Sequence, residues 1–346
     1  MSETTPFEAD IAEQPDALRR LLEAPSTASE LATIAGRPWD RIVFTGMGSS
    51  HFAAIPAWRR LVNKGLPTWA IDTGELVDNP SLLTTDSLLI VTSQSGASGE
   101  VVELLDRLAD EELPVGAVLG VAADDESPLA VSADVYLPLH SGKEATVSTK
   151  SYLNTLAVHC RIAAAFTGED PARIDDGILA AAEQVAAVIG NLDVNPIGTW
   201  VHDLGAPRLV AVGKADASAT AQYAALITKE SSKVPIEGFV GGQFRHGPFE
   251  LAGPGLVAFL FGASAHDGDS SISRLAHDLI STGSEVVLIG DLCIEGAQTL
   301  EVPVTGPLEA LATASVAAQL VAVDIARARG LVPGAFEYGS KVTTAL

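Results

Sequence analysis

The chain has 346 residues, of which 47% are hydrophobic, and its formal net charge is -23 at neutral pH. This length allows two domains of ordinary size with a substantial core, and the hydrophobic content excludes a mainly disordered protein. The acidity argues against a nucleic-acid partner, because affinity for phosphate backbones depends on clustered lysines and arginines.

Strands and helices alternate along the first half of the chain. Apolar, β-branched runs predict strands over residues 42–45, 68–71, 87–92, 115–121 and 135–137. Apolar residues at helical spacing predict helices over residues 15–23, 50–62, 99–109, 150–165 and 175–192. Because consecutive parallel strands need a crossover connection, this alternation predicts a buried parallel sheet.

The second half of the chain repeats the beginning of the first. Arg41-Ile-Val-Phe-Thr-Gly46 and Arg208-Leu-Val-Ala-Val-Gly213, which lie 167 residues apart, each combine a basic residue, an apolar strand and a glycine turn. In each copy, small residues follow and enter a predicted helix. The strands expected in this half cover residues 209–212, 256–261, 285–288 and 300–304, and its helices cover residues 218–231, 271–281 and 308–327.

This repeat is too long for a solenoid and fits two tandem α/β domains. We predict a first domain over residues 1–165, a second over residues 166–330, and a tail over residues 331–346 that is rich in glycine, proline and hydroxyl residues. Each domain is expected to be a parallel sheet flanked by helices, in the three-layer arrangement of flavodoxin-like folds.

Nothing in the sequence indicates export, membrane insertion or metal binding. No apolar run approaches the length that spans a bilayer, and the N-terminus lacks the basic and apolar regions of a signal peptide. We therefore expect a cytoplasmic protein without a membrane partner. Cys160 and Cys293 lie in apolar segments without metal-ligand spacing, which favours buried free thiols in a reducing compartment. Neither a metal nor a cofactor is expected.

The sharpest motif is Ser93-Gln-Ser-Gly-Ala-Ser98, which follows an apolar strand and precedes a predicted helix. Its three hydroxyls, its amide and its flexible glycine lie where the free N–H groups and the dipole of the helix favour an anion. A serine-rich helix cap is the simpler interpretation. Three serines in six residues exceed what a cap needs, so we predict a phosphate site at this edge of the sheet.

Two further segments are weaker candidates for ligand loops. Gly46-Met-Gly-Ser-Ser50 lacks the third glycine of a dinucleotide-binding fingerprint and the Gly-Lys-Ser/Thr of a Walker A loop. On its own, it is best read as an ordinary strand-to-helix turn. Glu144-Ala-Thr-Val-Ser-Thr-Lys150 fits a ligand contact and a helix start capped by Ser148 or Thr149 about equally well.

Several motifs in a fixed order resemble the sugar isomerase (SIS) family. They are the Ser93–Ser98 motif, the glycine-serine loop before it, Ser148-Thr-Lys150 after it, and Arg245-His-Gly-Pro248 later in the chain. The likeness is greatest to the isomerase half of the glutamine–fructose-6-phosphate aminotransferases, and it extends from Glu13 to Thr343. It implies two SIS domains that act on a small sugar phosphate, in a homodimer whose active sites use both subunits.

The resemblance also implies which side chains contact the substrate. The phosphate cradle would consist of Ser93, Gln94, Ser95 and Ser98. The sugar would be contacted by Ser49 and Ser50, and the pocket would be lined by Thr146.

Three catalytic residues follow from the same resemblance, and each suits one step of aldose–ketose interconversion. Glu230 falls on the family's isomerisation base, and a carboxylate can move a proton between C1 and C2. His246 falls on the ring-opening histidine, which the neighbouring subunit contributes, and histidine titrates near neutral pH. Lys341 falls on the lysine that forms a Schiff base with the open-chain ketose. Without the resemblance, these would be a solvated helix residue, a capping residue and a charged tail residue.

The sequence also departs from the aminotransferases. It starts almost directly at the isomerase half and has no cysteine near residue 1, so we expect no hydrolysis of glutamine by a domain of its own. Ile227 stands where the family has a lysine, three residues before Glu230. The proton-transfer machinery and the substrate are therefore expected to differ from those of the aminotransferases.

We expect an enzyme that isomerises a ketose phosphate or an amino-sugar phosphate and couples this step to release or addition of an amine. The alternative is a sensor that binds a sugar phosphate without catalysis, although the three catalytic groups and the lack of a DNA-binding segment speak against it. The interpretation as a nicotinamide oxidoreductase is supported only by the β/α alternation and a partial glycine loop. Incorporation of solvent deuterium into a bound sugar phosphate separates the enzyme from the sensor.

Overall fold

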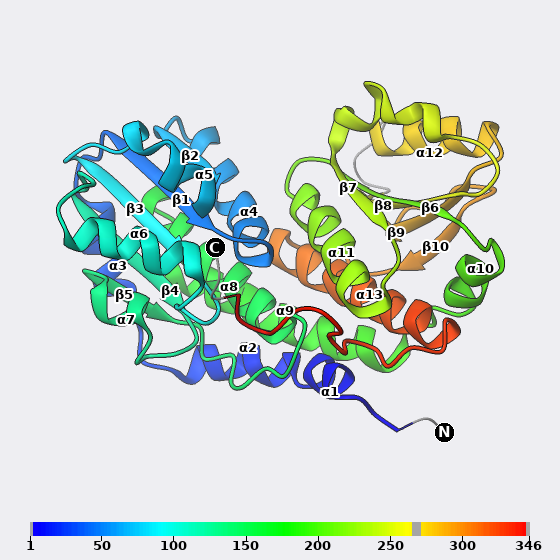
Figure 1. Cartoon of the computed structure of the whole chain (residues 1–346), viewed down its shortest axis with the longest axis horizontal. Helices are drawn as coiled ribbons and strands as arrows, with labels where there is room; N and C mark the ends of the chain where they lie inside the picture. The colour runs from blue at the N-terminus through cyan, green and yellow to red at the C-terminus, as the bar shows by residue number, and fades with distance from the viewer. Residues whose placement is uncertain (1–2, 265–270, 344–346) are drawn as a thin grey trace. The chain divides into compact units, whose positions relative to one another are not determined.

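The computed structural model describes residues 3–264 and 271–343 (Figure 1). The chain divides into two compact units, each built from several segments. The first unit consists of Asp16–Glu144, Lys150–Leu179 and Tyr338–Leu346, and the second consists of Met1–Pro15, Ala145–Thr149 and Ala180–Glu337. Within the described residues, each unit holds a five-stranded parallel sheet flanked by helices, which confirms the predicted fold of two tandem α/β domains.

In the first unit, the described strands follow the order β2-β1-β3-β4-β5. These strands are β1 (Arg41–Gly46), β2 (Thr68–Asp72), β3 (Ser87–Thr92), β4 (Ala117–Ala122) and β5 (Val135–Pro138). The accompanying helices are α2 (Gln14–Glu23), α3 (Ala28–Ala35), α4 (Ser49–Asn63), α5 (Thr73–Asp78), α6 (Gly99–Ala109), α7 (Pro128–Ser132), α8 (Lys150–Thr167) and the first part of α9 (Pro171–Asn191), with a 3-10 turn, η1, at Pro80–Leu82. The register places Gly46 beside both Asp72 and Thr92, and Thr92 beside Val121, so the carboxyl ends of four strands lie level at one edge.

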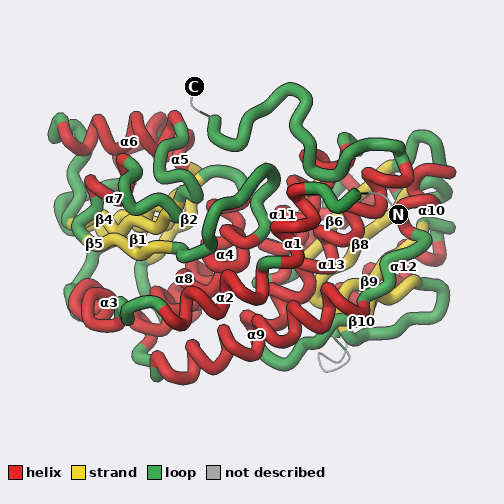
Figure 2. Tube along the Cα trace, turned by 90° about the horizontal axis from the view of Figure 1, so that it is seen from below, coloured by secondary structure: helices red, strands yellow, loops and turns green. Residues whose placement is uncertain are grey.

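Apolar side chains cover both faces of this sheet. On one face, Val43 and Leu89 belong to the same core cluster as Val101 of α6. On the other face, the ring of Phe44 lies 5.5 Å from that of His159 in α8. Figure 2 shows α6 and α7 on one side of the strands and α8 on the other. Because both faces are filled, ligand contacts have to come from the loops at the ends of the strands.

The sheet of the second unit repeats this arrangement, since its described strands follow the order β10-β9-β8-β6-β7. These strands are β6 (Arg208–Gly213), β7 (Ile236–Val240), β8 (Leu256–Ala263), β9 (Glu285–Gly290) and β10 (Gln298–Glu301). Its helices are α1 (Pro6–Ala12), the second part of α9, α10 (Ile197–Asp203), α11 (Ala217–Ser232), α12 (Ser271–Ser281) and α13 (Pro307–Ala328), with 3-10 turns η2 at Gly241–Arg245 and η3 at Pro248–Leu251. Strand β1 lies between β2 and β3, and its repeat β6 lies between β7 and β8. This equal placement confirms the predicted duplication.

Two strands of the second unit differ from the sequence prediction. Strand β7, which was not predicted, contains Glu237 and Gly238, and both weaken a strand pattern. It nevertheless pairs with β6 along its whole length. Strand β10 ends at Glu301, so the prediction of a strand over residues 300–304 was wrong for its second half. That half includes Pro303, which has no N–H to donate to a strand ladder.

Helix α13 is, within the described residues, the one helix that is long and apolar enough to cross a membrane by length and composition. The expectation that no apolar run approaches that length was therefore wrong. However, 78% of its most apolar stretch is buried inside the protein, and the helix packs against α10 and α11. Such burial is typical of a core helix.

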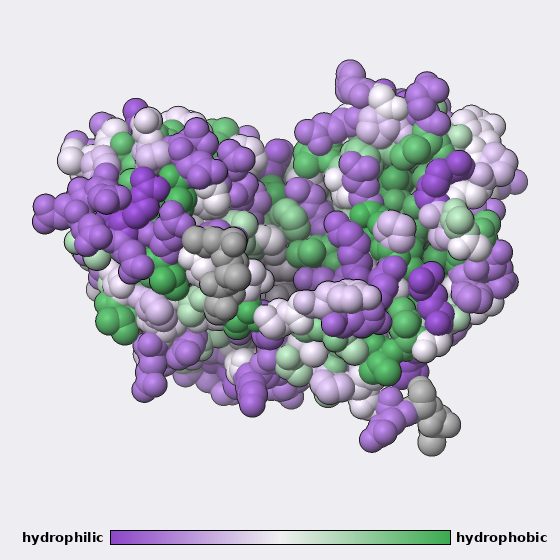
Figure 3. All heavy atoms as spheres, in the orientation of Figure 1, coloured by the Kyte–Doolittle hydropathy of each residue, from purple (hydrophilic) through white to green (hydrophobic). Residues whose placement is uncertain are grey.

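Hydrophilic residues cover much of the visible face of each unit in Figure 3, with hydrophobic residues scattered among them. The net charge of -23 is accordingly best explained as a feature of the solvated surface. Cys293 is exposed and Cys160 is half-buried, so the expectation of buried thiols was wrong for Cys293 and is met only in part by Cys160. The reason is that Cys293 lies in the turn after β9 rather than in the strand itself.

Candidate functional site

The strand order of the first unit reverses between β1 and β3. After β1 the chain enters α4, which packs with α8, and after β3 it enters α6 on the opposite face. In open parallel sheets, ligands bind in the crevice at the carboxyl ends of two such strands. The first turn of α4, which follows β1, and the loop after β3 carry six predicted contact residues, which are Ser49, Ser50, Ser93, Gln94, Ser95 and Ser98. The structure therefore brings these six residues to one edge of one sheet.

The loop after β3 is fixed to the neighbouring strand. The Ser93 N–H donates to the Val121 carbonyl at 3.0 Å, and the Ala123 N–H donates to the Gln94 carbonyl at 3.0 Å. Ser93 is buried, whereas Gln94 is half-buried. The first two residues of the loop thus continue the contact between β3 and β4, which gives the predicted phosphate cradle a rigid base.

Two serines of the loop hold its backbone in shape. The Ser93 Oγ accepts from the Gly96 N–H at 3.2 Å, and the Ser95 Oγ accepts from the Ala97 N–H at 3.2 Å. A hydroxyl that accepts a hydrogen bond still has its own proton to donate. Both side chains can therefore shape the loop and donate to a phosphate oxygen at the same time.

The path of the loop depends on Gly96. Its φ is +64°, and a Cβ at this position would lie 2.1 Å from the Ser127 Oγ. Ser127 is itself held in place, because its Oγ caps α7 by accepting from the Ala130 N–H at 3.3 Å. The Leu129 N–H also donates to the Gly96 carbonyl at 3.1 Å. Position 96 therefore requires glycine for its backbone conformation and for its close contact with α7.

Helix α6 begins where the loop ends, with Ser98 as its N-cap. Among the described residues, the Ser98 side chain makes no cap hydrogen bond, so its hydroxyl is not committed to the helix. The Gly99 N–H donates to the Thr343 carbonyl at 3.0 Å, which brings the C-terminal segment of the chain to this helix end. The partial positive charge at a helix N-terminus adds to the attraction for an anion.

The loop after β1 approaches the end of β3 closely. A Cβ on Gly46 would lie 2.7 Å from the Thr92 carbonyl oxygen. Gly48 has a φ of 52° and a ψ of -124°, a conformation that other residues rarely adopt, and it caps α4. Ser49 and Ser50 form the first turn of α4 and are half-buried. The glycines thus allow close packing, while the serines lie at a second helix N-terminus.

His51 follows these serines and was not among the predicted site residues. Burial lowers its pKa, and the nearby Asp72 carboxylate opposes that shift. Its Nδ1 is buried and has no hydrogen-bond partner in the part of the chain that the structure describes. A neutral imidazole offers one donor and one acceptor, so His51 can contact a polar ligand group. The only feature of the sequence that could have pointed to His51 as a site residue was its position directly after two serines.

A second histidine supports the end of β3. His159, on α8, lies 2.9 Å through its Nε2 from the Thr92 Oγ1, and Thr92 directly precedes Ser93. Complete burial lowers the pKa of His159 to about 3, so its ring is neutral at physiological pH. The sequence shows only a histidine within an apolar helix, and nothing local identifies its partner.

Replacing His159 with glutamine is expected to flatten the acid side of the pH–stability profile. The histidine pKa is 6.5 in its ordinary state and about 3 in the folded protein. Between these values the unfolded chain binds a proton that the folded chain does not, so stability falls as the pH drops, by up to about 1.4 kcal/mol per pH unit. Urea unfolding at several pH values below 6.5 measures this slope. His277→Gln, which changes an exposed histidine, is the control, and equal slopes in wild type and His159→Gln would contradict a buried neutral ring.

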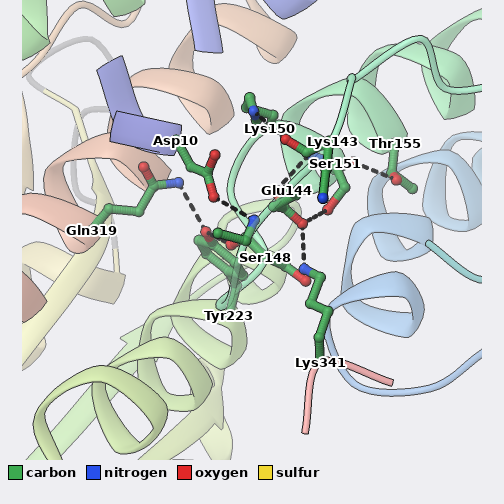
Figure 4. A network of polar contacts seen from close by, with 11 residues as sticks. Asp10, Lys143, Glu144, Ser148, Lys150, Ser151, Thr155, Tyr223, Gln319 and Lys341 are labelled. Carbon is green, nitrogen blue, oxygen red and sulfur yellow. Dashed lines mark hydrogen bonds and ion pairs between the residues drawn. The ribbon is translucent and has the colours of Figure 1, made fainter. Parts of the chain in front are cut away.

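Lys341 pairs with a carboxylate to which the sequence assigned no role. Its Nζ lies 2.6 Å from the Glu144 Oε2 (Figure 4). The Glu144 side chain is completely buried, while that of Lys341 is 21% exposed. Glu144 also accepts from the Ser151 N–H at 3.1 Å and from the Ser151 Oγ at 2.7 Å. Glu144 therefore joins the first turn of α8 to the C-terminal segment.

Glu230 belongs to the second unit, where it lies half-buried in the last turn of α11. Lys233, the C-cap of this helix, donates from its Nζ to the Glu230 carbonyl and, at 2.6 Å, to the Ala335 carbonyl. These contacts fix the backbone beside Glu230. Ile227, where the resemblance implied a lysine, is completely buried and therefore contributes to the core.

His246 and Thr146 also belong to the second unit. His246 follows the turn Gly241–Arg245, donates its N–H to the Gln243 carbonyl at 3.0 Å and is exposed. The Thr146 Oγ1 is buried and, among the residues described, has no hydrogen-bond partner. An unsatisfied buried hydroxyl is unfavourable, and a ligand that bonded to it would remove that penalty.

A buried polar network holds the segment that carries Thr146. The Tyr223 hydroxyl donates to the Ser148 carbonyl at 2.7 Å and accepts from the Gln319 Nε2 at 2.8 Å (Figure 4). Gln319 and Gln14 exchange two more hydrogen bonds, of 2.7 and 3.0 Å. The sequence did not reveal this network, because its members lie far apart along the chain.

Comparison with known proteins agrees with this architecture. Residues 37–164 match the model of the family described as SIS domain. A glutamine–fructose-6-phosphate aminotransferase (isomerizing) from Caulobacter vibrioides is 25% identical, over 94% of this chain and 56% of its own length. The chain spans about half the length of the curated relatives it matches.

Two solved structures share the fold along almost the whole chain. Glucosamine-6-phosphate deaminase from Thermotoga maritima is similar with a TM-score of 0.74 and 22% identity. The match covers 98% of this chain and 99% of the deaminase chain. Tagatose-6-phosphate ketose/aldose isomerase from Escherichia coli has a TM-score of 0.78 at 20% identity, with 96% of each chain covered. Residues 37–164 therefore match the SIS domain, and the chain as a whole shares the fold of these two solved structures.

Proposed function

We propose that this chain is an enzyme that isomerises a ketose phosphate or an amino-sugar phosphate, and that isomerisation is coupled to release or addition of an amine. The observation that carries the proposal is the serine-rich loop after β3, at the point where the strand order reverses. Its hydroxyls and the N-terminus of α6 suit one phosphate group held by neutral donors.

The names of the similar proteins support a sugar phosphate as the substrate. One is named for fructose 6-phosphate, one for glucosamine 6-phosphate and one for tagatose 6-phosphate. Because all three names contain a sugar 6-phosphate, we propose a hexose 6-phosphate as the substrate class for this chain.

Each proposed catalytic group has one task. His246 opens the sugar ring by moving a proton between the ring oxygen and the anomeric hydroxyl. Lys341 forms an imine with the carbonyl of the open-chain ketose and thereby makes the neighbouring C–H bond more acidic. Glu230 takes a proton from one of the carbons C1 and C2 and returns it to the other.

We further propose that the enzyme works in the cytoplasm as a homodimer, in which His246 serves the site of the neighbouring copy. The exposure of His246 supports this proposal, because its side chain is accessible to a second chain. Analytical ultracentrifugation of the active protein is expected to show a dimer. A monomer with full activity would exclude a shared site.

The test of function is incubation of the pure protein in D2O with hexosamine 6-phosphates and, separately, with ketohexose 6-phosphates and ammonia. We expect deuterium at C1 or C2, and release of ammonia from the amino sugar that is the substrate. Binding of a sugar phosphate without deuterium exchange would identify a sensor instead. If no sugar phosphate bound, both functions would be excluded.

A further inference from the structure

We propose that Glu144 positions the Lys341 amine and exchanges the protons of imine formation with it and with the departing hydroxyl. This inference rests on the proposed function, in which Lys341 forms an imine with a ketose phosphate. Glu144 would hold the amine at the site before the substrate binds and accept the proton that the amine has to lose.

The first argument is the environment of the Glu144 carboxylate. The side chain is completely buried and accepts two hydrogen bonds from Ser151, at 3.1 Å from its N–H and 2.7 Å from its Oγ (Figure 4). The Lys341 Nζ lies 2.6 Å from the same carboxylate. A carboxylate removed from water stays ionised only if donors and a positive charge compensate it. The N-terminus of α8, to which Ser151 belongs, adds a favourable dipole. Glu144 is therefore suited to remain an anion and to bind an ammonium group.

The second argument is the attachment of the segment that carries the amine. Two residues beyond Lys341, the Thr343 carbonyl accepts from the Gly99 N–H at 3.0 Å. Gly99 is the first residue of α6 and directly follows Ser98 of the proposed phosphate cradle. The segment is thus fixed by the ion pair at residue 341 and by a hydrogen bond at residue 343. These contacts keep the amine on a segment that touches the end of the phosphate loop.

The third argument is the proton balance of imine formation. An ammonium has no free electron pair, so Lys341 has to lose a proton before it attacks a carbonyl. Transfer of that proton to Glu144 converts the ion pair into an amine and a carboxylic acid without a change in net charge. The amine electron pair then forms the C–N bond, the carbonyl π electrons move to oxygen, and a proton shift from nitrogen to oxygen gives a carbinolamine. Loss of the hydroxyl with the proton from Glu144 releases water and leaves an iminium ion beside the regenerated carboxylate.

The first test needs no sugar. Labelling with trinitrobenzenesulfonate, followed by peptide mass spectrometry, compares Lys341 with Lys64, an exposed lysine of the same unit. In wild type we expect Lys341 to react about tenfold more slowly than Lys64, because it is ion-paired to a buried carboxylate. Glu144→Gln removes that charge and is expected to bring the two rates within about threefold of each other.

The second test measures the imine. The protein is incubated with a ketohexose 6-phosphate that it turns over, and borohydride reduces any imine to a stable adduct. We expect this adduct on Lys341 in wild type, and about tenfold less of it or lower still in Glu144→Gln. Glu144→Asp keeps the carboxylate and is expected to restore part of the trapping. Glu126→Gln, which changes an exposed glutamate of the same unit, is the matched control. Binding of inorganic phosphate is expected to stay unchanged in all three variants, a result that general damage to the fold would not produce.

The outcomes separate this inference from the proposed function. Equal labelling of Lys341 and Lys64 in wild type overturns the inference, even if Glu144→Gln does not fold. Undiminished trapping in folded Glu144→Gln also overturns it. If Glu144→Gln relieves a slow labelling of Lys341 but wild type traps no sugar, the pairing with Glu144 is supported and the imine of the proposed function is excluded.

Discussion

Glu230→Gln is expected to lower the rate of deuterium exchange at C1 and C2 by about 10²–10⁴-fold, the usual contribution of a general base. Glutamine has nearly the size of glutamate, but its amide cannot take a proton from carbon. Glu230 is half-buried in the last turn of α11, and the contacts of Lys233 fix the backbone there. The helix is therefore expected to keep its place in the variant, and binding of the phosphate group is expected to change little.

The measurement is NMR of the sugar phosphate in D2O, combined with calorimetric binding of a hexitol 6-phosphate, which has no carbonyl to react. Glu237→Gln is the matched control, because Glu237 is an exposed glutamate of the same unit. It is expected to exchange deuterium at the wild-type rate. Exchange at that rate in Glu230→Gln would show that another group is the base, and loss of hexitol binding in both variants would point to damage of the fold.

The fold was largely predictable because its central strands are buried on both faces. Strand β3 and helix α6 have the bounds that their apolar patterns predict, since every residue of β3 is buried and α6 shows one apolar stripe. Strand β7 at the edge of its sheet carries a glutamate and a glycine, and its identity as a strand comes from pairing with β6. Tertiary pairing of this kind leaves no local pattern in the sequence.

The candidate site, like the fold, was predictable from the sequence only in part. The loop Ser93–Ser98 was visible because its hydroxyls are consecutive in the sequence and follow a buried strand. The pair of Glu144 and Lys341 joins residues that are 197 positions apart, and the pair of Thr92 and His159 joins residues 67 positions apart. Only the folded chain determines such partners, so sequence reasoning identified Lys341 through a resemblance and left Glu144 without a role.

Gly96→Ala is expected to reduce phosphate binding by about tenfold or more and to lower the free energy of unfolding by about 2–5 kcal/mol. A φ of +64° is unfavourable for alanine, and its Cβ would lie 2.1 Å from the Ser127 Oγ, which caps α7. The loop can escape this overlap only by moving away from α7. Such a movement would break the hydrogen bond from the Gly96 N–H to the Ser93 Oγ and displace the hydroxyls that are proposed to hold the phosphate.

Gly65→Ala separates the two causes of this effect. Gly65 has a φ of +82° and lies in the same unit, but among the described residues no atom lies within 4 Å of the place where its Cβ would be. Gly65→Ala therefore carries only the backbone penalty, about 1–2 kcal/mol, and is expected to bind phosphate normally. Urea unfolding and phosphate calorimetry compare the two variants. Equal stability and equal binding would show that the contact between Gly96 and Ser127 does not shape the loop, and the phosphate cradle would then have to be sought elsewhere at the edge of the sheet.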